Sequence, residues 1–177
     1  MKLTFLGTGT SFGVPQIGCD CAVCRSDDPR DKRTRVGAVI EHEGVRLLLD
    51  APPELRLQLI ANGIDDVDAV LFTHDHADHT HGIDDIRAIS VRRGSALPMF
   101  GPQETLDLLR DRFGYIFDQR LPAIAGTLKP EGALTAVTPG TPFMVAGVEV
   151  VALEVPHGRA RVFGYRVGPI GYVTDAK

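Results

Sequence analysis

The stretch THDHADH, residues 73–79, decides how this sequence is interpreted. It follows the apolar run DAVLF, which is typical of a buried strand. In an extended segment, residues two apart point the same way, so His74 and His76 can reach one metal ion. Asp78 and His79 come one turn later, where a helix is expected to begin, and would face a second ion. Imidazole and carboxylate groups are ordinary ligands of divalent metals. The spacing therefore predicts two ligands for each of two neighbouring ions.

A polar loop with histidines placed by chance is the alternative explanation of this stretch. The chain has six histidines, and three of them fall in the pattern directly after an apolar run, which favours the metal site. Two further titratable residues of the stretch HDHADHTH, residues 74–81, lie outside the pattern. We expect Asp75 to cap or hydrogen-bond locally, and His81 to lie on a helix face or a pocket wall.

Length and composition are those of a soluble globular protein. The 177 residues, 44% hydrophobic and 24% charged, suggest one domain over 1–177. The net charge of −4 argues against broad, nonspecific nucleic-acid binding, which needs a basic face. No apolar run reaches the ~20 residues that span a bilayer, and Gly7 interrupts the apolar start before a signal peptide could form. With three cysteines and no export signal, we expect a cytoplasmic protein without a disulfide framework.

The rest of the chain alternates strands with helices, which indicates an α/β or α+β layered fold. Strands are expected at 2–6, 35–41, 45–50, 68–73, 98–100, 134–137, 148–155, 162–167 and 170–174, and helices at 53–63, 79–92 and 103–113. The segment Gly114–Gly132 shows no clear period. We expect a long loop there, and its position makes it a candidate cover for the substrate.

Three motifs together resemble one family. The stretch THDHADH resembles the signature of the metallo-β-lactamase-fold hydrolases. The opening FLGTGTS, residues 5–11, and the loop GCDCAVC, residues 18–24, resemble its phosphodiesterase branch. This branch contains ribonuclease Z and the PhnP-type phosphoribosyl 1,2-cyclic phosphate phosphodiesterases, and the short cysteine loop favours the second. The resemblance extends along the whole chain and implies an αββα sandwich.

The resemblance assigns roles to three further residues. Asp50, in LLLDAPPE, stands where the family has an acidic residue that ends a strand, and it would orient a histidine ligand by a hydrogen bond. His157, in EVPHG, matches the third-motif histidine, which binds the first metal. Asp175, in GYVTDAK, matches the aspartate that bridges both metals.

The resemblance implies a centre for two divalent ions, expected to be zinc or manganese. The first ion would be bound by His74, His76, His157 and Asp175, and the second by Asp78, His79, Asp175 and a histidine outside this chain. Asp78 and Asp175 are the expected catalytic aspartates, and a hydroxide that bridges the ions would attack phosphorus.

This sequence departs from the family pattern after His157. The family has a later histidine that binds the second metal, and no histidine follows His157 here. The family has two similar halves, and this chain stops two residues past Asp175. We therefore expect a C-terminally truncated sandwich that lacks most of its second half. A parent protein would be active, whereas this chain alone would be inactive or impaired. The uncovered half-sandwich would expose apolar surface, so self-association or a homodimer is expected.

Cys19, Cys21 and Cys24 form a second candidate metal site. Three thiolates this close can hold one zinc ion; three free thiols in a reducing cytoplasm are the alternative. The resemblance implies a structural zinc whose fourth ligand is a histidine of the C-terminal part. Without that histidine, the site would bind zinc more weakly, take an outside ligand or be empty.

Two arginine pairs could contact a phosphate, Arg33 with Arg35 and Arg159 with Arg161. Ordinary surface arginines are the expected interpretation. The loop GTGTSFG, residues 7–13, lacks the lysine and spacing of a P-loop. We expect it to be a tight exit from a strand, with direct substrate binding as the alternative.

The expected function is a metal-dependent phosphodiesterase acting on a cyclic or small phosphodiester. A ribonuclease Z-like RNA nuclease is one rival, but it would need a long basic arm that the sequence does not show. A thioester or lactam hydrolase on the same metals is another, and a non-enzymatic metal-binding module is the third. The expected partner is therefore a small phosphodiester, with nucleic acid less favoured and no membrane.

Overall fold

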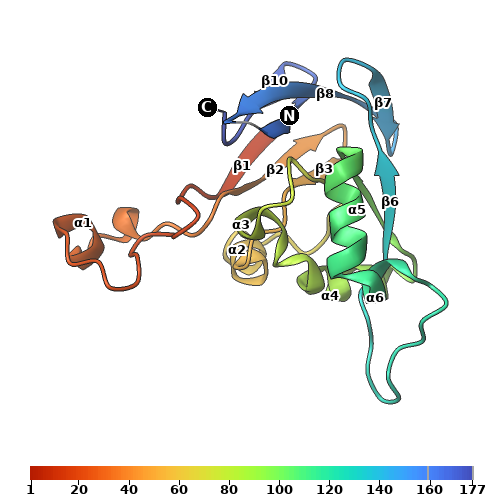
Figure 1. The fold of residues 1–177 in the computed structure, drawn as a ribbon, viewed down its shortest axis with the longest axis horizontal. Coiled ribbons are helices and arrows are strands. Elements are labelled where there is room, and N and C mark those ends of the chain that lie inside the picture. The colour runs from red at the N-terminus through yellow and green to blue at the C-terminus, as the bar shows by residue number, and fades with distance from the viewer. Residues whose placement is uncertain (159, 177) are drawn as a thin grey trace.

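Two β-sheets form the centre of the fold in the computed structural model, which describes residues 1–158 and 160–176 (Figure 1). The strands are β1 (Lys2–Gly7), β2 (Gly37–His42), β3 (Val45–Leu49), β4 (Ala69–Leu71), β5 (Leu97–Gly101), β6 (Gly132–Ala136), β7 (Pro142–Val145), β8 (Val148–His157), β9 (Ala160–Val167) and β10 (Ile170–Tyr172). The first sheet has the order β1 to β6, with β1 to β3 antiparallel and β3 to β6 parallel. The second sheet has the antiparallel order β10-β9-β8-β7.

The helices cover one face of the six-stranded sheet (Figure 1). They are α2 (Leu55–Ala61), α3 (Ala77–Thr80), the 3-10 helix η2 (Ile83–Ile86), α4 (Arg87–Arg93), α5 (Gln103–Arg112) and α6 (Gly114–Phe117). Two further short helices, α1 (Ala22–Arg25) and the 3-10 helix η1 (Pro29–Asp31), lie on an arm, residues 8–36, that extends away from the sheets. Among the described residues, no helix is long and apolar enough to cross a membrane.

Two hydrophobic cores lie on opposite faces of the six-stranded sheet. In β3, Leu48 packs among the helices, whereas Leu47 and Leu49 face the second sheet. In β4, Val70 packs among the helices and Leu71 faces the second sheet. Because both faces of these strands are buried, their sequences are continuous apolar runs rather than alternating ones. Each fully buried leucine contributes roughly 1.5–3 kcal/mol to folding.

This helix–sheet–sheet arrangement confirms the predicted layered α/β fold and accounts for three layers of the predicted αββα sandwich. The described residues place no helix on the outer face of the four-stranded sheet (Figure 1). Apolar side chains are exposed in that sheet, among them Met144 in β7 and Leu153 in β8. The strand β7 was not expected from the sequence; PFMV is too short to show a period.

The predicted helix over 79–92 is wrong in its continuity, because the chain forms α3, η2 and α4 instead. The break is at Gly82, whose N–H donates to the Ala51 carbonyl at 2.8 Å. The Ala51 N–H in turn donates to the His79 carbonyl at 2.7 Å. A Cβ atom at Gly82 would lie 1.9 Å from the Pro52 carbonyl oxygen. The chain is therefore held against the loop that follows β3, which a continuous helix would not permit.

The segment Gly114–Gly132 also differs from the prediction. Its first residues form α6, and the loop that follows extends away from the sheets, on the opposite side of α5 from α3 (Figure 1). It does not cover the predicted metal ligands at α3, so it does not serve as the expected cover for a substrate there.

We predict that Gly82→Ala lowers the free energy of unfolding by about 3 kcal/mol, because the added methyl group would collide with the rigid Pro52 backbone. Chemical denaturation measures the change. The matched control is Gly114→Ala, where an added Cβ meets nothing within 4 Å. Equal stability of the two variants would show that the contact at Gly82 does not constrain the fold.

Candidate metal centre

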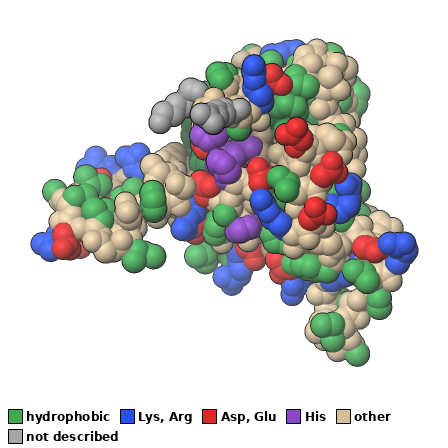
Figure 2. Space-filling model, viewed as in Figure 1, with side chains coloured by type: hydrophobic (Ala, Val, Ile, Leu, Met, Phe, Trp, Pro, Cys, Tyr) green, Lys and Arg blue, Asp and Glu red, His purple; other side chains and the backbone are tan. Residues whose placement is uncertain are grey.

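The structure brings all six predicted ligands to the junction of the two sheets. They are His74 and His76 after β4, Asp78 and His79 in α3, His157 at the end of β8 and Asp175 after β10. Figure 2 shows histidine side chains gathered at the surface, with acidic side chains beside them. The residues of the first sheet reach this place from the carboxyl end of a parallel strand, where open α/β sheets commonly bind ligands.

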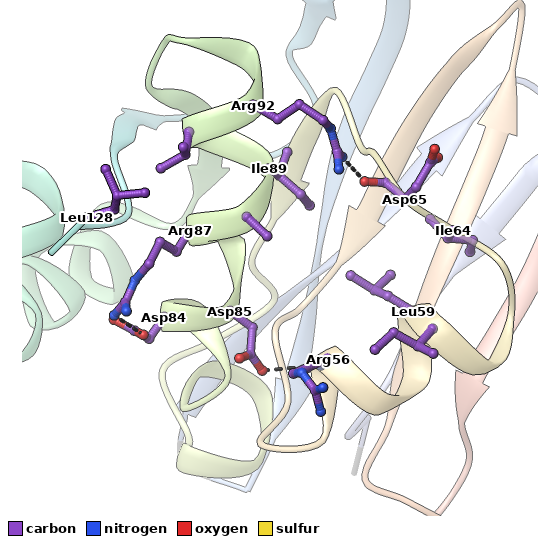
Figure 3. A pocket seen from close by; sticks show the side chains of 13 residues that line it. Arg56, Leu59, Ile64, Asp65, Asp84, Asp85, Arg87, Ile89, Arg92 and Leu128 are labelled. Carbon is purple, nitrogen blue, oxygen red and sulfur yellow. Dashed lines mark hydrogen bonds and ion pairs between the residues drawn. The ribbon is translucent and has the colours of Figure 1, made fainter.

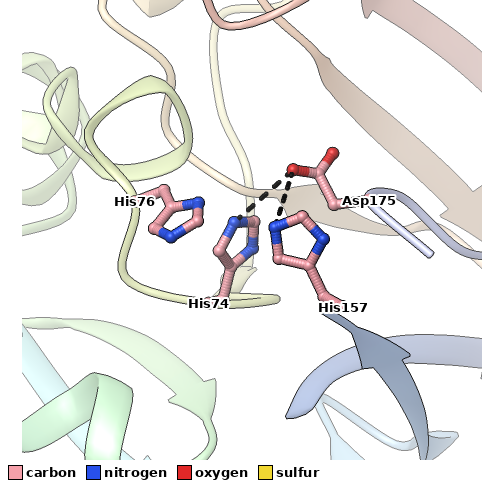
Figure 4. Close-up of side chains that lie close together, drawn as sticks. All are labelled: His74, His76, His157 and Asp175. Atoms are coloured by element: carbon pink, nitrogen blue, oxygen red, sulfur yellow. Dashed lines mark ion pairs between the residues drawn. The ribbon is translucent and has the colours of Figure 1, made fainter. Parts of the chain in front are cut away.

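Four residues meet as the group predicted for the first ion (Figure 4). His74, His76, His157 and Asp175 each offer one ligand atom, and these atoms lie within 4.8 Å of one another. Asp175 Oδ2 is 3.7 Å from His74 Nε2 and 3.9 Å from His157 Nε2. Two ligands about 2.1 Å from a tetrahedral ion lie about 3.4 Å apart. The group can therefore close on one divalent ion with small side-chain movements.

The residues predicted for the second ion meet at His79. Its Nε2 atom is 3.5 Å from Asp78 Oδ2 and 3.5 Å from Asp175 Oδ2. Asp175 Oδ2 thus lies within 4 Å of ring nitrogens of His79, from the second group, and of His74 and His157, from the first. A single carboxylate in this position is able to contact two ions at once.

Buried ring nitrogens without partners test whether a metal fits this site. Among the described residues, His74 Nε2, His79 Nε2 and His157 Nδ1 have no hydrogen-bond partner. The His74 residue is 4% exposed and His79 is fully buried. An unsatisfied buried polar atom costs roughly 1–3 kcal/mol, and a metal ion would satisfy the two Nε2 atoms. The nitrogen and oxygen donors suit zinc or manganese.

Asp50 fixes the orientation of two of these rings. Its fully buried carboxylate accepts hydrogen bonds from Thr73 N at 2.7 Å, Thr73 Oγ1 at 2.8 Å and His79 Nδ1 at 2.7 Å. Because the Thr73 hydroxyl donates to Asp50, it accepts from His74 Nδ1, 2.9 Å away. Both histidines then carry a hydrogen on Nδ1 and turn Nε2 to the centre.

The charges of the centre shift its pKa values in opposite directions. Burial, assisted by nearby His79, lowers the pKa of His74 to about 4. Burial would also lower the pKa of His79, but the Asp50 carboxylate outweighs it and raises that pKa to about 9. Burial opposes ionisation of Asp175, yet His79 holds its pKa below the ordinary value. His74 is therefore a neutral ligand at pH 7, and a metal ion that binds His79 must displace a proton.

Two aspartates of the centre have left-handed backbones, with φ of 60° at Asp50 and 51° at Asp175. Among the described residues, the other non-glycine residues with positive φ are Glu43 and Ala146, each in a tight turn before a glycine. Aspartate tolerates this region better than most residues, but it remains unfavourable. Local strain therefore coincides with the centre, as it commonly does at functional sites.

Arg112 contacts Asp75, an interaction that the sequence did not predict. Its guanidinium donates to the Asp75 carbonyl at 2.6 Å and to Asp75 Oδ2 at 2.7 Å. Asp75 lies between His74 and His76, so α5 holds the ligand loop from outside. The expected local bond of the Asp75 carboxylate is thus replaced by a partner 37 residues away, which no local spacing could indicate.

His81 lies at the end of α3, as expected for a helix-face residue. Its ring packs edge-on against Phe113, with the ring centroids 5.7 Å apart. The structure does not bring it into the group of ligands.

The three cysteines form a separate cluster on the arm. The Sγ atoms of Cys19, Cys21 and Cys24 lie within 4.8 Å of one another, and none is in a disulfide. The Cys24 N–H donates to Cys21 Sγ at 3.5 Å, and this contact, with others from Cys19 and Cys24, lowers the pKa of the Cys21 thiol. The cluster fits a zinc ion through three thiolates, and the described residues supply no fourth ligand.

The arginines considered for phosphate binding have different surroundings. Arg35 forms an ion pair with Glu54 and donates to the Ser11 carbonyl, which secures the base of the arm. Arg33 lies on the arm, where its side chain donates to the Arg30 carbonyl. Arg161 lines a cavity beside His74 and His76, and Arg159 lies outside the described residues. The loop 7–13 runs into the arm, where the Gly9 N–H donates to the Thr34 carbonyl at 2.8 Å.

A second cavity, of about 490 Å³, lies between α2 and the η2–α4 segment (Figure 3). Apolar side chains such as Leu59 and Ile89 line it. At its rim, Arg87 pairs with Asp84 at 2.5 Å, and Asp85 accepts from the backbone N–H of Arg56 at 3.2 Å. It contains none of the predicted ligands, so we place the chemistry at the histidines.

Comparison with protein families finds the beta-lactamase superfamily domain over residues 45–177. Among solved structures, a diphosphatase from the PhnP family superposes with a TM-score of 0.84 at 37% identity, covering 96% of this chain and 62% of that one. Zinc-bound PqqB from Methylobacterium extorquens superposes with a TM-score of 0.75 at 22% identity, covering 97% of this chain and 63% of that one. Human tRNase Z, short form, superposes with a TM-score of 0.59 at 20% identity, covering 94% of this chain and 64% of that one. The last two likenesses show the fold alone.

Several curated relatives match nearly the whole chain, two of them as follows. An octanoyltransferase of Porphyromonas gingivalis is 44% identical over 178 residues, which cover 100% of this chain and 35% of that protein. Coenzyme PQQ synthesis protein B of Rhodopseudomonas palustris (strain TIE-1) is 27% identical over 185 residues, which cover 97% of this chain and 58% of that protein. The chain therefore spans less than two thirds of the length of either relative.

We predict that Asp50→Asn weakens zinc binding by about 100-fold, because an NH2 group in place of Oδ2 cannot accept from Thr73 Oγ1 and His79 Nδ1, the two hydrogen bonds that orient His74 and His79. Competition with a chromogenic chelator measures the affinity. Asp85→Asn, a change of the same type away from the histidines, serves as the control and should bind zinc as the unmodified protein does. Unchanged affinity in Asp50→Asn would contradict its orienting role.

We also predict that Arg112→Ala weakens zinc binding by about 10-fold, because the loop of His74 and His76 loses its anchor on α5. Arg110→Ala is the matched control, since Arg110 lies on the same helix and pairs with Asp107 instead. Isothermal titration with zinc compares them. An equal effect of both substitutions would assign the loss to the helix rather than to the loop.

Proposed function

This chain belongs to the beta-lactamase superfamily, as its sequence motifs indicated, and from that premise we propose that it is a metal-dependent phosphodiesterase acting on a small or cyclic phosphodiester. One observation carries the proposal: Asp175 Oδ2 lies within 4 Å of a ring nitrogen of three histidines, in position to bridge two ions. The likeness to a diphosphatase of the PhnP family, at 37% identity, supports phosphorus chemistry over other hydrolysis.

Different residues of the centre would bind each ion and orient the ligands. We assign His74, His76, His157 and Asp175 to the first ion, and Asp78, His79 and Asp175 to the second. When bound, two divalent ions would supply an acidic water and offset the negative charge that develops on a phosphate. Asp50 and Thr73 hold the rings in one tautomer, and Arg112 holds the loop that carries two of them. Because the rings are preorganised, no reorientation is needed during the reaction.

A thioester hydrolase on the same metal centre is the second candidate. The octanoyltransferase of Porphyromonas gingivalis, at 44% identity, favours an acyl substrate. The match covers 35% of that protein, so its name can equally describe the part outside the match. The phosphodiesterase therefore remains the first proposal, and the two candidates predict different substrates for one ligand set.

We predict that the zinc- or manganese-loaded full-length protein hydrolyses bis-p-nitrophenyl phosphate, and that chelator treatment abolishes turnover reversibly. His76→Ala should lower kcat/KM at least about 100-fold, because it removes a ligand of the first ion. His42→Ala, which removes a histidine at the end of β2, is the control and should retain activity. Hydrolysis of an octanoyl thioester without hydrolysis of the phosphodiester would contradict the first proposal in favour of the second.

A further inference from the structure

A protruding loop, residues 118–131, presents apolar side chains to the solvent. It follows α6 and extends outward beyond the helices (Figure 1). Its tip, residues 121–127, has the sequence LPAIAGT, carries no charged side chain and is exposed at every residue. The Ile124 residue is 79% exposed, and Figure 2 shows hydrophobic side chains at the end of the loop. Exposed apolar surface of this kind is typical of an interaction site.

The loop tip is held in one conformation by its own hydrogen bonds. The Thr127 N–H donates to the Ile124 carbonyl at 2.8 Å, and the Thr127 hydroxyl donates to the same oxygen at 2.7 Å. Gly126 closes this turn with a φ of 79°. At the base of the loop, the Lys129 ammonium donates to the Asp118 carbonyl at 2.8 Å. The Ile124 side chain is therefore presented on an ordered turn, and little conformational entropy remains to be lost when it binds.

The cavity of about 490 Å³ between α2 and the η2–α4 segment has a complementary apolar lining (Figure 3). Leu59, Ile60 and Ile89 line it, and Leu128 borders it from the base of the loop. Cavities of roughly 300–1,000 Å³ accept small organic molecules. The side chains of a short turn therefore fit into this one.

The charges at the rim of this cavity balance one another. Arg87 pairs with Asp84 at 2.5 Å, and the Arg92 guanidinium donates to the Asp65 carbonyl. The lining has three guanidinium groups and three carboxylates, which belong to Arg56, Arg87, Arg92, Asp65, Asp84 and Asp85. Without a net charge at the rim, electrostatics favours neither an anionic nor a cationic occupant. An uncharged apolar segment such as the loop tip is the complementary occupant.

A second copy of the chain can bring the tip and the cavity together. The tip extends outward from the body of the protein, so it does not fill the cavity of its own chain (Figure 1). In a two-fold symmetric dimer each copy gives and receives the same contact, so two tips fill two cavities. One tip and one cavity then need to bury only about 400 Å² each to reach the ~800 Å² per partner of a standard interface. A tip of fully exposed residues can supply this area.

We propose that this protein forms a two-fold symmetric homodimer in which the loop tip of each copy, with Ile124 at its centre, inserts into the cavity between α2 and α4 of its partner. The occupant is a second copy because one chain carries both the uncharged tip and the apolar cavity. The inference is independent of the proposed phosphodiesterase function. It places self-association on the helical side of the protein and not on the outer face of the four-stranded sheet.

Sedimentation velocity of the full-length protein between about 1 and 100 μM measures the association, and we expect a dimer with a Kd in the low micromolar range. Ile124→Asp and Ile60→Lys should each raise Kd at least about 100-fold, because each places a charge in both symmetry-related contacts. The Ile60 residue is 64% exposed, so both substitutions lie at the surface. Unchanged zinc content and thermal stability show that each variant is folded.

A mixture of these two variants identifies the contact. In a mixed dimer, one contact between tip and cavity is unmodified, and the other joins the introduced carboxylate to the introduced ammonium group. The mixture should therefore dimerise at concentrations at which each variant alone is monomeric.

Two control variants change exposed apolar residues outside the proposed contact. Leu57→Lys is matched to Ile60→Lys, since Leu57 lies on the same helix, is 60% exposed and does not line the cavity. Met144→Asp is matched to Ile124→Asp, since Met144 is a 60% exposed apolar residue of the four-stranded sheet. Both control variants should dimerise as the unmodified protein does.

Three results would overturn the proposal. The first is a monomer at every concentration up to about 100 μM. The second is a dimer that Met144→Asp dissociates and Ile124→Asp leaves intact, because the copies would then associate through the four-stranded sheet. The third is a mixture of Ile124→Asp and Ile60→Lys that stays monomeric where the unmodified protein dimerises, because the tip would then not enter the cavity.

Discussion

The buried carboxylate of Asp50 is the interaction on which the centre depends. A charge taken out of water costs several kcal/mol unless it is fully hydrogen-bonded, and Asp50 receives three hydrogen bonds, from Thr73 and His79. These bonds offset the cost of burial and of a left-handed backbone at φ 60°. Their consequence is that His74 and His79 each present Nε2 to the same space. The position of one carboxylate thus determines the geometry of both halves of the centre.

The second sheet must also be held in register with the first, since it supplies His157 and Asp175. Two buried contacts join the sheets near the ligands: the Phe163 N–H donates to the Thr73 carbonyl at 2.9 Å, and the Tyr165 hydroxyl donates to the Phe72 carbonyl at 2.6 Å. Both lie on β9, which pairs with β8 and β10. The packing of two sheets therefore assembles a site that neither sheet holds alone.

The sequence predicted which residues lie together where the information is local. The spacing of His74, His76, Asp78 and His79 is contained in one short stretch, and the apolar runs predicted the layered fold. Asp50, His157 and Asp175 were identified only through resemblance, because each is brought in from a distant strand. Arg112 was missed for the same reason. The break of the predicted helix over 79–92 depends on a backbone contact between Gly82 and the loop after β3, which no periodicity records.

The most direct test is a crystal structure of the zinc-loaded full-length protein with anomalous scattering measured at the zinc edge. The account predicts two peaks at the junction of the sheets, one within about 2.2 Å of ring nitrogens of His74, His76 and His157 and the other beside Asp78 and His79, with Asp175 contacting both. A zinc ion bound only at Cys19, Cys21 and Cys24, with no peak at the histidines, would contradict it.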